Sequence, residues 1–376
     1  MNKKNKIAVL VSGGVDSAYS LLTLSRQYDV TAFYLKIWNP QYEEDGDSCP
    51  WKEDVEYVEK LCKQLNVPLK IVNLQNEYQF TVMEYMISEL KAGRTPNPDI
   101  FCNYYIKFGA FFDHISFDEY DYVASGHYAT KLDKDDDFIY WHSADPVKDQ
   151  TFFLCKLTPN QIKKIIFPCS GWSKQSIREF ARINNLPQKD RKDSQGLCFI
   201  GNINYSEFVS KYIEKNEGYI YDISSGRTLG IHNGLHLYTE GQRHGLNLPN
   251  GPWYVYAKDV YKNELYAVNR LDFHKYVTNK ISIDIKTLSI NDSFYENDGQ
   301  LYIKIRHPQT ELVKGSLITN SEILFGKKVY RTYIQTESNF HPWNYSSGQL
   351  IAFYQKDDFG FRLIGNATIT NEKRYK

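Results

Sequence analysis

A short run near the N-terminus carries the residue types of a phosphate-binding turn. Residues 12–17 read Ser-Gly-Gly-Val-Asp-Ser and follow an apolar stretch, residues 7–11, that predicts a buried strand. A helical pattern begins near Asp16, so the glycines occupy a turn between a strand and a helix. Such a turn presents backbone N–H groups and the positive end of a helix dipole to an anion. The run therefore predicts a phosphate cradle, and a tight turn that simply needs glycine is the alternative. Because the Gly-Lys-Ser/Thr ending of a Walker loop is missing, a kinase or GTPase is disfavoured.

Two of the six cysteines lie in segments that could do sulfur chemistry. Cys102 follows the sequence Arg-Thr-Pro-Asn-Pro-Asp of residues 94–99. The two prolines predict a stiff loop that would hold Asp99 as an acid or base and Cys102 as a nucleophile. Cys198 lies between two glycines, with basic residues nearby in the sequence that could lower the pKa of its thiol. For both cysteines, a buried and inert thiol is the alternative.

A third cluster of polar groups occupies residues 145–150, which read Asp-Pro-Val-Lys-Asp-Gln. Charged and amide side chains lie here in a turn-like setting. The cluster could bind a ligand, or it could be an ordinary solvated surface.

The composition is that of a globular protein with two or three domains. The chain has 376 residues, of which 42% are hydrophobic and 24% charged. No apolar run approaches the roughly 20 residues that span a bilayer, and we expect neither a signal peptide nor a transit peptide in residues 1–6. The formal net charge is zero, so binding of nucleic acid would require a local basic face. Because no Cys-x-x-Cys pair is present, a zinc ribbon is disfavoured.

Strand and helix signals alternate over about the first 130 residues. Strands are expected at residues 7–11, 31–38, 69–74 and 122–124, and helical stripes at residues 18–24, 55–65 and 80–92. This alternation predicts a parallel sheet with helices on both faces, in which ligands bind at the carboxyl ends of the strands. Residues 12–17 and 125–127 both lie at such ends.

Beyond the expected sheet, the sequence changes character twice. Helical signals continue to about residue 213, with Thr158 and Ser173 as expected helix N-caps. After Gly218, short strand-like runs are separated by Gly, Asn and Asp, and from about residue 280 the pattern is almost entirely β. We therefore expect three domains, at residues 1–213, 214–278 and 279–376, the last being a β-barrel or sandwich.

Six motifs in a fixed order resemble a known family. They are SGGVDS at 12–17, GRTPNPDIFCN at 93–103, ASGHYA at 124–129, KDQTFFL at 148–154, KDSQGLCFIG at 192–201 and GQRHGL at 241–246. The first resembles the PP-loop of ATP pyrophosphatases, which join AMP to a substrate oxygen. The full set resembles the tRNA-specific 2-thiouridylases over nearly the whole chain. The resemblance implies a doubly wound α/β domain of the PP-loop ATP pyrophosphatase type, similar to the adenine nucleotide alpha hydrolases, followed by a small central domain and a C-terminal β-barrel.

The resemblance also assigns roles to individual residues. The catalytic group would comprise Cys198 as carrier of a persulfide, Cys102 as its partner thiol and Asp99 as a proton-transfer group. The ATP site would comprise Leu10, Val11, Ser12, Gly13, Gly14, Val15, Asp16 and Ser17, flanked by Leu35 and Gly126. The target base would face Asn97, Pro98 and Asp99, and the rest of the tRNA would contact His127, Lys148, Asp149, Gln150, Arg306, His307 and Gln349. His307 departs from the Tyr that we expect in relatives.

The implied activity is the ATP-dependent 2-thiolation of the wobble uridine of tRNA, with ATP and Mg²⁺ as cofactors and no metal site of the protein's own. The implied partners are the tRNAs for Lys, Glu and Gln and a sulfur donor, either a cysteine desulfurase or a relay protein. The chain would act as a monomer, away from membranes, in the bacterial cytoplasm or in an organelle. Candidates for a basic tRNA-binding face lie in the C-terminal part of the chain, at Lys304, Arg306, Lys314, Lys327, Lys328 and Arg331.

The implied chemistry requires the two thiols to meet. Adenylation turns a carbonyl oxygen into part of a good leaving group, a persulfide sulfur displaces it, and a second thiol releases that sulfur. We expect loop motion to bring Cys102 and Cys198 within disulfide reach. Two alternatives remain: an amide-forming or lysine-adding PP-loop synthetase, which has no use for two thiols, and an RNA-binding module with an inactive ATP loop.

Overall fold

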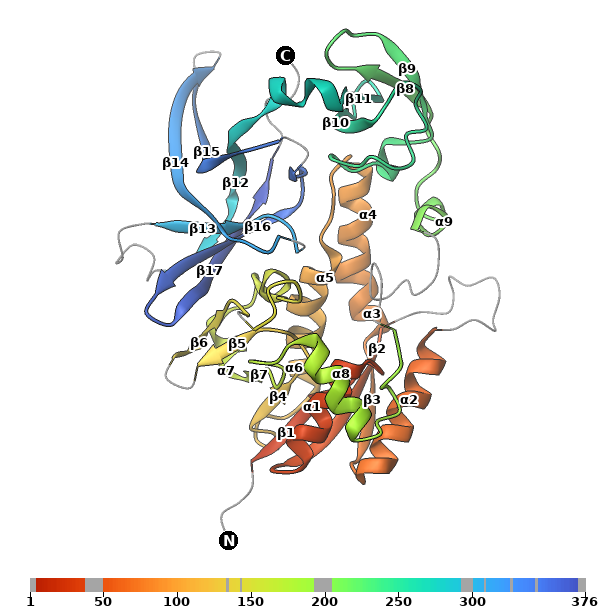
Figure 1. Ribbon diagram of the computed structural model, residues 1–376, viewed down its shortest axis with the longest axis vertical. Helices are drawn as coiled ribbons and strands as arrows, with labels where there is room; N and C mark the ends of the chain where they lie inside the picture. Colours follow the sequence, from red (N-terminus) through yellow and green to blue (C-terminus); the bar gives the residue numbers. More distant parts are fainter. Residues whose placement is uncertain are drawn as a thin grey trace. The chain divides into compact units, whose positions relative to one another are not determined.

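The computed structural model describes residues 5–37, 50–132, 135–142, 144–192, 205–291, 300–307, 309–324, 327–341 and 344–370 (Figure 1). Cys198 lies outside these residues. The chain forms two compact units. The first consists of Met1–Met83, Pro98–Asn202 and Asp357–Leu363, and the second of Glu84–Asn97, Ile203–Lys356 and Ile364–Lys376.

The first unit is built on a five-stranded sheet of order β3-β2-β1-β4-β7. All four pairs of neighbouring strands are parallel. Its strands are β1 (Lys6–Leu10), β2 (Asp29–Lys36), β3 (Leu69–Asn73), β4 (Tyr122–Ala124) and β7 (Ile165–Ile166). The apolar runs of β1, β2 and β4 are mostly buried, as expected for strands of a parallel sheet covered on both faces, whereas the edge strand β3 is partly exposed. The expected doubly wound domain is thus confirmed.

Helices cover this sheet, and their apolar stripes form its core. The principal helices are α1 (Val15–Ser25), α2 (Pro50–Leu65) and α8 (Lys174–Ile183), and α1 packs against both of the others (Figure 1, lower part). Cys62 on α2 lies in the core as its stripe indicates, and burial raises the pKa of its thiol to about 11. The Ser173 hydroxyl accepts the Ser176 N–H and caps α8, as the sequence predicts.

Helical segments also frame the Pro-rich motif. One run comprises α3 (Gln75–Tyr78), a π-helical turn (Gln79–Met83) and α4 (Glu84–Lys91). A second comprises α5 (Pro98–Phe101), a π-helical segment (Cys102–Ala110) and α6 (Phe111–His114). The prediction that Asp99 and Cys102 lie in a stiff loop is therefore wrong, since both are helical. Pro98 can begin a helix because the first helical residues need no backbone N–H donor.

Two strands interrupt the region that the sequence predicts as helical. They are β5 (Thr130–Leu132) and β6 (Asp135–Tyr140), which pair antiparallel. Tyr140 of β6 also pairs with Arg362. Helices resume after them with a short 3₁₀ turn (Thr151–Leu154) and α7 (Pro159–Lys163). A complete capping box between Thr158 and Gln161 begins α7, so this expected N-cap is confirmed.

The second unit contains a small sheet and a barrel. After α9 (Tyr205–Ser210), four strands form a sheet of order β10-β11-β8-β9 around a small apolar core. They are β8 (Gly218–Asp222), β9 (Thr228–His232), β10 (Trp253–Asp259) and β11 (Glu264–Asn269). One 3₁₀ turn, Leu235–Leu237, lies between β9 and β10, and a second, Arg270–Tyr276, follows β11.

Six antiparallel strands then close into a barrel, one of the two architectures that the sequence predicts. Their order is β12-β15-β14-β13-β16-β17, and pairing of β12 with β17 closes the ring. They are β12 (Thr278–Ile290), β13 (Leu301–Lys304), β14 (Val313–Leu324), β15 (Lys327–Phe340), β16 (Leu350–Asp357) and β17 (Gly360–Ile369). Among the residues that the structure describes, no helix has both the length and the apolar character to cross a membrane.

Candidate functional site

The turn after β1 has the geometry of an anion cradle. Gly13 has a φ of +77°, a backbone conformation that residues other than glycine rarely adopt. The Ser17 hydroxyl donates to the Gly14 carbonyl oxygen at 3.0 Å and accepts the Ser12 N–H at 3.2 Å, which fixes the turn against α1. The N-cap residue of α1 is Gly14, which has no side chain that could cap the N-terminus of the helix. The first-turn N–H groups are thus presented toward the turn, where a phosphate group would be stabilised.

The end of β4 closes this cradle from the next strand. A Cβ atom at Gly126 would lie 3.0 Å from the backbone carbon of Asp16 and 3.0 Å from the Ser17 nitrogen. Glycine is therefore needed for β4 to approach the start of α1 so closely. Leu35, the other residue expected beside the adenosine, is half-buried on β2 and pairs with Val72.

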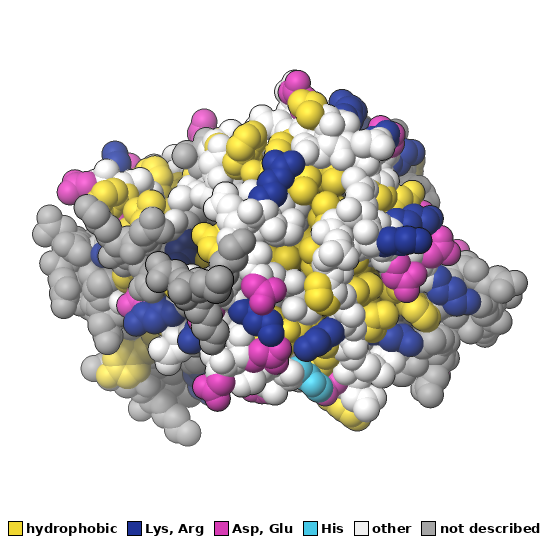
Figure 2. Space-filling model, turned by 90° about the horizontal axis from the view of Figure 1, so that it is seen from below, with side chains coloured by type: hydrophobic (Ala, Val, Ile, Leu, Met, Phe, Trp, Pro, Cys, Tyr) yellow, Lys and Arg dark blue, Asp and Glu magenta, His cyan; other side chains and the backbone are white. Residues whose placement is uncertain are grey.

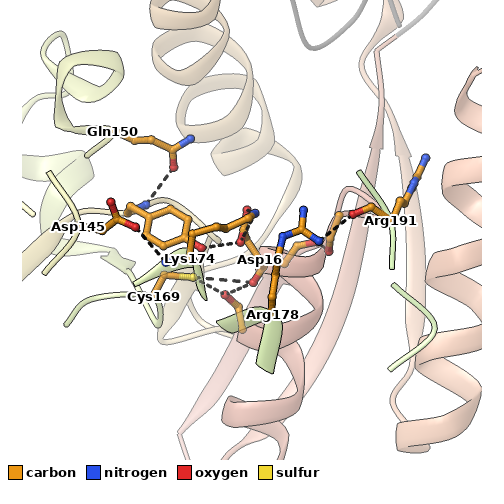
Figure 3. Close-up of polar contacts among 11 residues, drawn as sticks. Asp16, Asp145, Gln150, Cys169, Lys174, Arg178 and Arg191 are labelled. Carbon is orange, nitrogen blue, oxygen red and sulfur yellow. Dashed lines mark hydrogen bonds and ion pairs between the residues drawn. The ribbon is translucent and has the colours of Figure 1, made fainter. Parts of the chain in front are cut away.

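The carboxylate of Asp16 is held by two side chains from other elements (Figure 3). Lys174 at the start of α8 donates its ammonium group to both oxygens, at 2.8 and 2.7 Å. The Tyr128 hydroxyl donates to Oδ1 at 2.7 Å. The side chains of Asp16 and Lys174 are only 29% and 12% exposed, so solvent weakens this ion pair little.

Arg191 holds the other side of the turn. Its guanidinium donates to the Gly13 carbonyl oxygen at 2.9 Å and pairs with the Asp54 carboxylate on α2. Burial raises the pKa of the Asp54 carboxyl, and Arg191 opposes this rise. Arg178 on α8 donates to the Arg191 carbonyl oxygen at 3.0 Å, so this part of the chain is fixed to both helices (Figure 3).

The structure describes one of the two predicted catalytic thiols. Cys102 is buried at the start of the π-helical segment, and Asp99 is half-buried on the preceding turn of helix. π-Helical turns occur frequently at functional sites. Asn103, the next residue, donates its side-chain N–H to the Phe153 carbonyl oxygen at 3.0 Å. Because Cys198 lies outside the described residues, its meeting with Cys102 stays a prediction.

Two of the residues expected to contact tRNA in the first unit are buried. His127 shares a 2.8 Å hydrogen bond between its Nδ1 and the Ser125 hydroxyl. Burial lowers the pKa of His127 well below its usual value, and the charge of Lys107 adds to the decrease. The buried Asp149 carboxylate accepts the His142 N–H at 2.9 Å and the Thr151 hydroxyl. Both side chains are thus engaged within the protein, and a role in RNA binding would be to support neighbouring groups.

The remaining two members of this group lie at the edges of the same turn. The Lys148 backbone N–H donates to the Asp145 carbonyl oxygen at 3.0 Å and to its carboxylate at 3.3 Å. Gln150 exchanges hydrogen bonds with the backbone of Tyr128: its side-chain oxygen accepts the Tyr128 N–H at 3.0 Å, and its backbone N–H donates to the Tyr128 carbonyl oxygen at 2.9 Å.

In the second unit, four expected tRNA contacts lie on connected loops. Asn97 accepts the Leu350 N–H on its side-chain oxygen at 2.7 Å, and Arg306 donates to the Glu240 carbonyl oxygen at 3.0 Å and the Ser346 hydroxyl at 3.1 Å. Gln349 precedes Leu350, and its side-chain oxygen is buried without a hydrogen-bond partner among the described residues. Such an orphaned acceptor is costly unless a ligand satisfies it. His307 is half-buried beside Arg306, and Pro98 is buried at the start of α5.

The candidate basic face is smaller than the sequence indicates. Lys304 is fully buried, so its ammonium group cannot reach a phosphate, and its inclusion in this face is wrong. Lys314 pairs with Glu337 at 2.9 Å, which reduces its free charge. The side chains of Lys327 and Lys328 lie outside the described part of the chain.

Sequence reasoning missed three residues that hold the phosphate turn: Tyr128, Lys174 and Arg191. Tyr128 lies inside the ASGHYA motif, in which the resemblance implies roles only for Gly126 and His127. Lys174 follows the expected N-cap Ser173, and Arg191 is one of the basic residues close to Cys198 in the sequence. Their long-range pairing with residues near position 16 leaves no signal in a single sequence.

Residues 5–202 match the family model described as the tRNA methyl transferase HUP domain, and residues 206–269 match the tRNA methyl transferase PRC-barrel domain. The tRNA-specific 2-thiouridylase MnmA of Parabacteroides distasonis is 40% identical over 98% of this chain and 100% of its own length. The chain belongs to the tRNA-specific 2-thiouridylase family.

Other relatives agree with this family membership. The tRNA-specific 2-thiouridylase MnmA 1 of Bacteroides thetaiotaomicron is 39% identical over 83% of this chain and 88% of its own. The MnmA of Francisella tularensis subsp. holarctica is 42% identical over 72% of this chain and 77% of its own length. Among solved structures, U34-tRNA thiolase NcsA from Methanococcus maripaludis aligns over 56% of this chain and 64% of its own, with 20% identity and a TM-score of 0.33.

Proposed function

We propose that this 2-thiouridylase family member uses ATP to replace the carbon-2 oxygen of the wobble uridine of tRNA with sulfur. The observation that carries the proposal is the cradle formed by the turn after β1. Gly13 has a left-handed backbone there, Gly126 closes the cradle from β4, and the N-terminus of α1 opens onto it. Its glycines and N–H groups fit the phosphates of a nucleotide.

The first step is adenylation of the uracil oxygen. The carbonyl oxygen attacks the α-phosphorus of ATP, the bond to the β-phosphate breaks, and pyrophosphate leaves. Positioning and charge neutralisation dominate such phosphoryl chemistry. Mg²⁺ is commonly held by one or two carboxylates together with the phosphates themselves. Asp16, whose oxygens also accept hydrogen bonds from Lys174 and Tyr128, would be the carboxylate at the loop. When bound, the ion would neutralise phosphate charge.

The second step transfers sulfur. The terminal sulfur of a Cys198 persulfide forms a bond to carbon 2, and AMP leaves with the original oxygen. The thiolate of Cys102 displaces the transferred sulfur from Cys198, which leaves a disulfide that a cellular thiol must reduce. In a second route, Cys102 attacks the persulfide first and releases sulfide, which then attacks carbon 2. Asp99, one helical turn before Cys102, would act as the proton-transfer group in this step.

The proposed partners follow from this chemistry. They are the tRNAs for Lys, Glu and Gln, and a cysteine desulfurase or relay protein that delivers the persulfide. The proposed tRNA contacts are Lys148, Arg306, His307 and Gln349 at the surface loops, with Asn97 and Pro98 near the target base. We place the reaction in the bacterial cytoplasm or an organelle, with the protein as a monomer.

The test is mass spectrometry of wobble nucleosides after incubation with ATP, Mg²⁺, tRNA and a persulfide donor. We expect 2-thiouridine from the wild type and none from Cys198→Ser or Cys102→Ser, with tRNA binding retained in both. Cys62→Ala is the matched control, because Cys62 is a buried thiol in the hydrophobic core of the first unit and has no proposed role in sulfur transfer. Full thiolation by Cys198→Ser would refute the persulfide role.

The same assay separates the alternative enzyme class. A lysine-adding or amide-forming synthetase would release pyrophosphate and incorporate an amine in both cysteine variants. Loss of sulfur incorporation with retained adenylation would exclude it.

A further inference from the structure

The turn at residues 145–150 is linked to the phosphate loop by two separate hydrogen-bonded routes. Both end on the carboxylate of Asp16, and every residue involved belongs to the first unit. Figure 3 shows Asp145, Gln150, Lys174 and Asp16 arranged along these routes.

The first route passes through Tyr128. Gln150 holds the Tyr128 backbone through two hydrogen bonds, at 3.0 and 2.9 Å. The Tyr128 hydroxyl in turn donates to Asp16 at 2.7 Å. Tyr128 is itself buried, so its ring has little room to move independently of its backbone.

The second route passes through Lys174. Its backbone N–H donates to the Asp145 carboxylate at 3.0 Å, while its ammonium group donates to both oxygens of Asp16. The Lys148 backbone N–H also donates to Asp145. A shift of the backbone at Lys148 would therefore reach Lys174 through a single carboxylate.

Asp16 is the point at which these routes can affect nucleotide binding. It lies in the first turn of α1, next to the glycines of the cradle. A partly buried carboxylate there must keep its partners, because an uncompensated charge in such a place is costly. The position of the Lys174 ammonium and the Tyr128 hydroxyl therefore sets the position of Asp16.

We propose that Tyr128 and Lys174 are positioning residues that couple RNA bound at the 145–150 turn to the phosphate loop, so that tRNA and ATP strengthen each other's binding. The proposal rests on the function proposed above. Coupling between two ligands is reciprocal, and each must raise the affinity for the other by the same factor.

The test measures this factor directly. Isothermal titration calorimetry gives the dissociation constant of α,β-methylene-ATP, which cannot be cleaved at the bond that breaks in adenylation, with and without saturating tRNA. We expect tRNA to tighten binding to the wild type at least about fivefold. A ratio of one for the wild type would overturn the proposal.

Three variants interrupt the routes at different points. Asp145→Ala removes the link to Lys174 without removing a group from the phosphate loop, so we expect nucleotide affinity without tRNA within about twofold of wild type and a reduced enhancement by tRNA. Tyr128→Phe removes one hydroxyl and should also reduce the enhancement. Lys174→Met should abolish the second route, and Lys174→Arg should restore part of it because a cation returns.

Lys131→Met is the matched control. Its ammonium group donates to the carbonyl oxygens of Ile162, Lys163 and Ile165, away from Asp16. We expect its enhancement to equal that of the wild type. If Lys174→Met does not fold, Asp145→Ala and Tyr128→Phe decide the question. Wild-type enhancement in both would refute the coupling.

Failure of this inference is distinguishable from failure of the proposed function. A wild-type protein that makes 2-thiouridine while its nucleotide affinity ignores tRNA would contradict only the coupling. A protein that makes no 2-thiouridine with any persulfide donor would contradict the function itself.

Discussion

Single side chains determine whether the phosphate turn is ready for a nucleotide. Arg191 joins the Gly13 carbonyl oxygen to Asp54, and hydrogen bonds to charged groups contribute about 1.5–3 kcal/mol. We expect Arg191→Gln to weaken nucleotide binding about tenfold or more, measured by calorimetry with α,β-methylene-ATP. Arg191→Lys should recover part of the loss, because it keeps the charge. Unchanged affinity in Arg191→Gln would show that the turn holds its shape without this clamp.

Gly126 provides a second prediction at this scale. A methyl group there would press on the backbone of Asp16 and Ser17, and backbone cannot move aside as a flexible side chain can. We expect Gly126→Ala to weaken nucleotide binding by at least about tenfold. Gly230→Ala is the control, because its Cβ meets only the end of the Leu248 side chain. Equal affinities in the two variants would remove the steric argument.

The sequence predicts the residues whose roles depend on their neighbours in the chain, and it misses those whose roles depend on contacts with distant residues. The Ser-Gly-Gly-Val-Asp-Ser run is recognisable because turn and helix start are neighbours in the chain. Lys174 is 158 positions from Asp16 in the chain, and nothing at position 174 distinguishes it from a solvated lysine. Lys304 is the reverse case, since a lysine in a strand suggests a basic surface, yet its side chain is buried.

At the scale of elements, α8 is the helix on which the site depends most. It carries Lys174 and Arg178, and Ser173 caps it. Removal of an N-cap costs about 1 kcal/mol. We therefore expect Ser173→Ala to lower the thermal unfolding midpoint by a few degrees and to weaken nucleotide binding as well.

The capping box of α7 offers a matched comparison. Thr158→Ala should destabilise by a similar amount, but α7 carries none of the groups that hold the phosphate turn, so nucleotide affinity should stay unchanged. Equal effects of the two substitutions on nucleotide binding would mean that α8 has no special role.

Elements that follow simple periodicity are predictable, and irregular ones are not. The apolar runs of β1 and β2 and the stripe of α2 give the parallel sheet directly. Strand β6 begins with three aspartates, which have poor strand propensity, so its pairing with β5 overrides the local pattern. The Pro-rich motif predicts a stiff loop that includes Asp99 and Cys102, but Pro98 starts a helix instead, because proline is suited both to a loop and to the first turn of a helix.

At the scale of the whole molecule, stability should depend on pH through a buried histidine. Burial lowers the pKa of His127 well below its usual value of 6.5. As pH falls below 6.5, the unfolded chain binds a proton there while the folded chain does not, so stability decreases. We expect the thermal midpoint to fall between pH 7 and pH 5, and His127→Gln to show a smaller decrease. An identical pH dependence in the variant would exclude this contribution.

The charge balance of the molecule makes a final prediction about RNA binding. Lys and Arg total 45, as do Asp and Glu, and on the face seen in Figure 2 positive and negative side chains are interspersed. Because the formal net charge is zero, tRNA affinity should depend on local phosphate contacts, each adding about 0.7–0.9 to the slope of log affinity against log salt. We expect Lys148→Gln to reduce this slope by about one contact, measured by filter binding at 50–300 mM salt. Lys60→Gln is the control, because Lys60 is an exposed lysine on α2 beside Glu56. Equal slopes in both variants would show that Lys148 makes no phosphate contact and that the 145–150 turn does not face the RNA backbone.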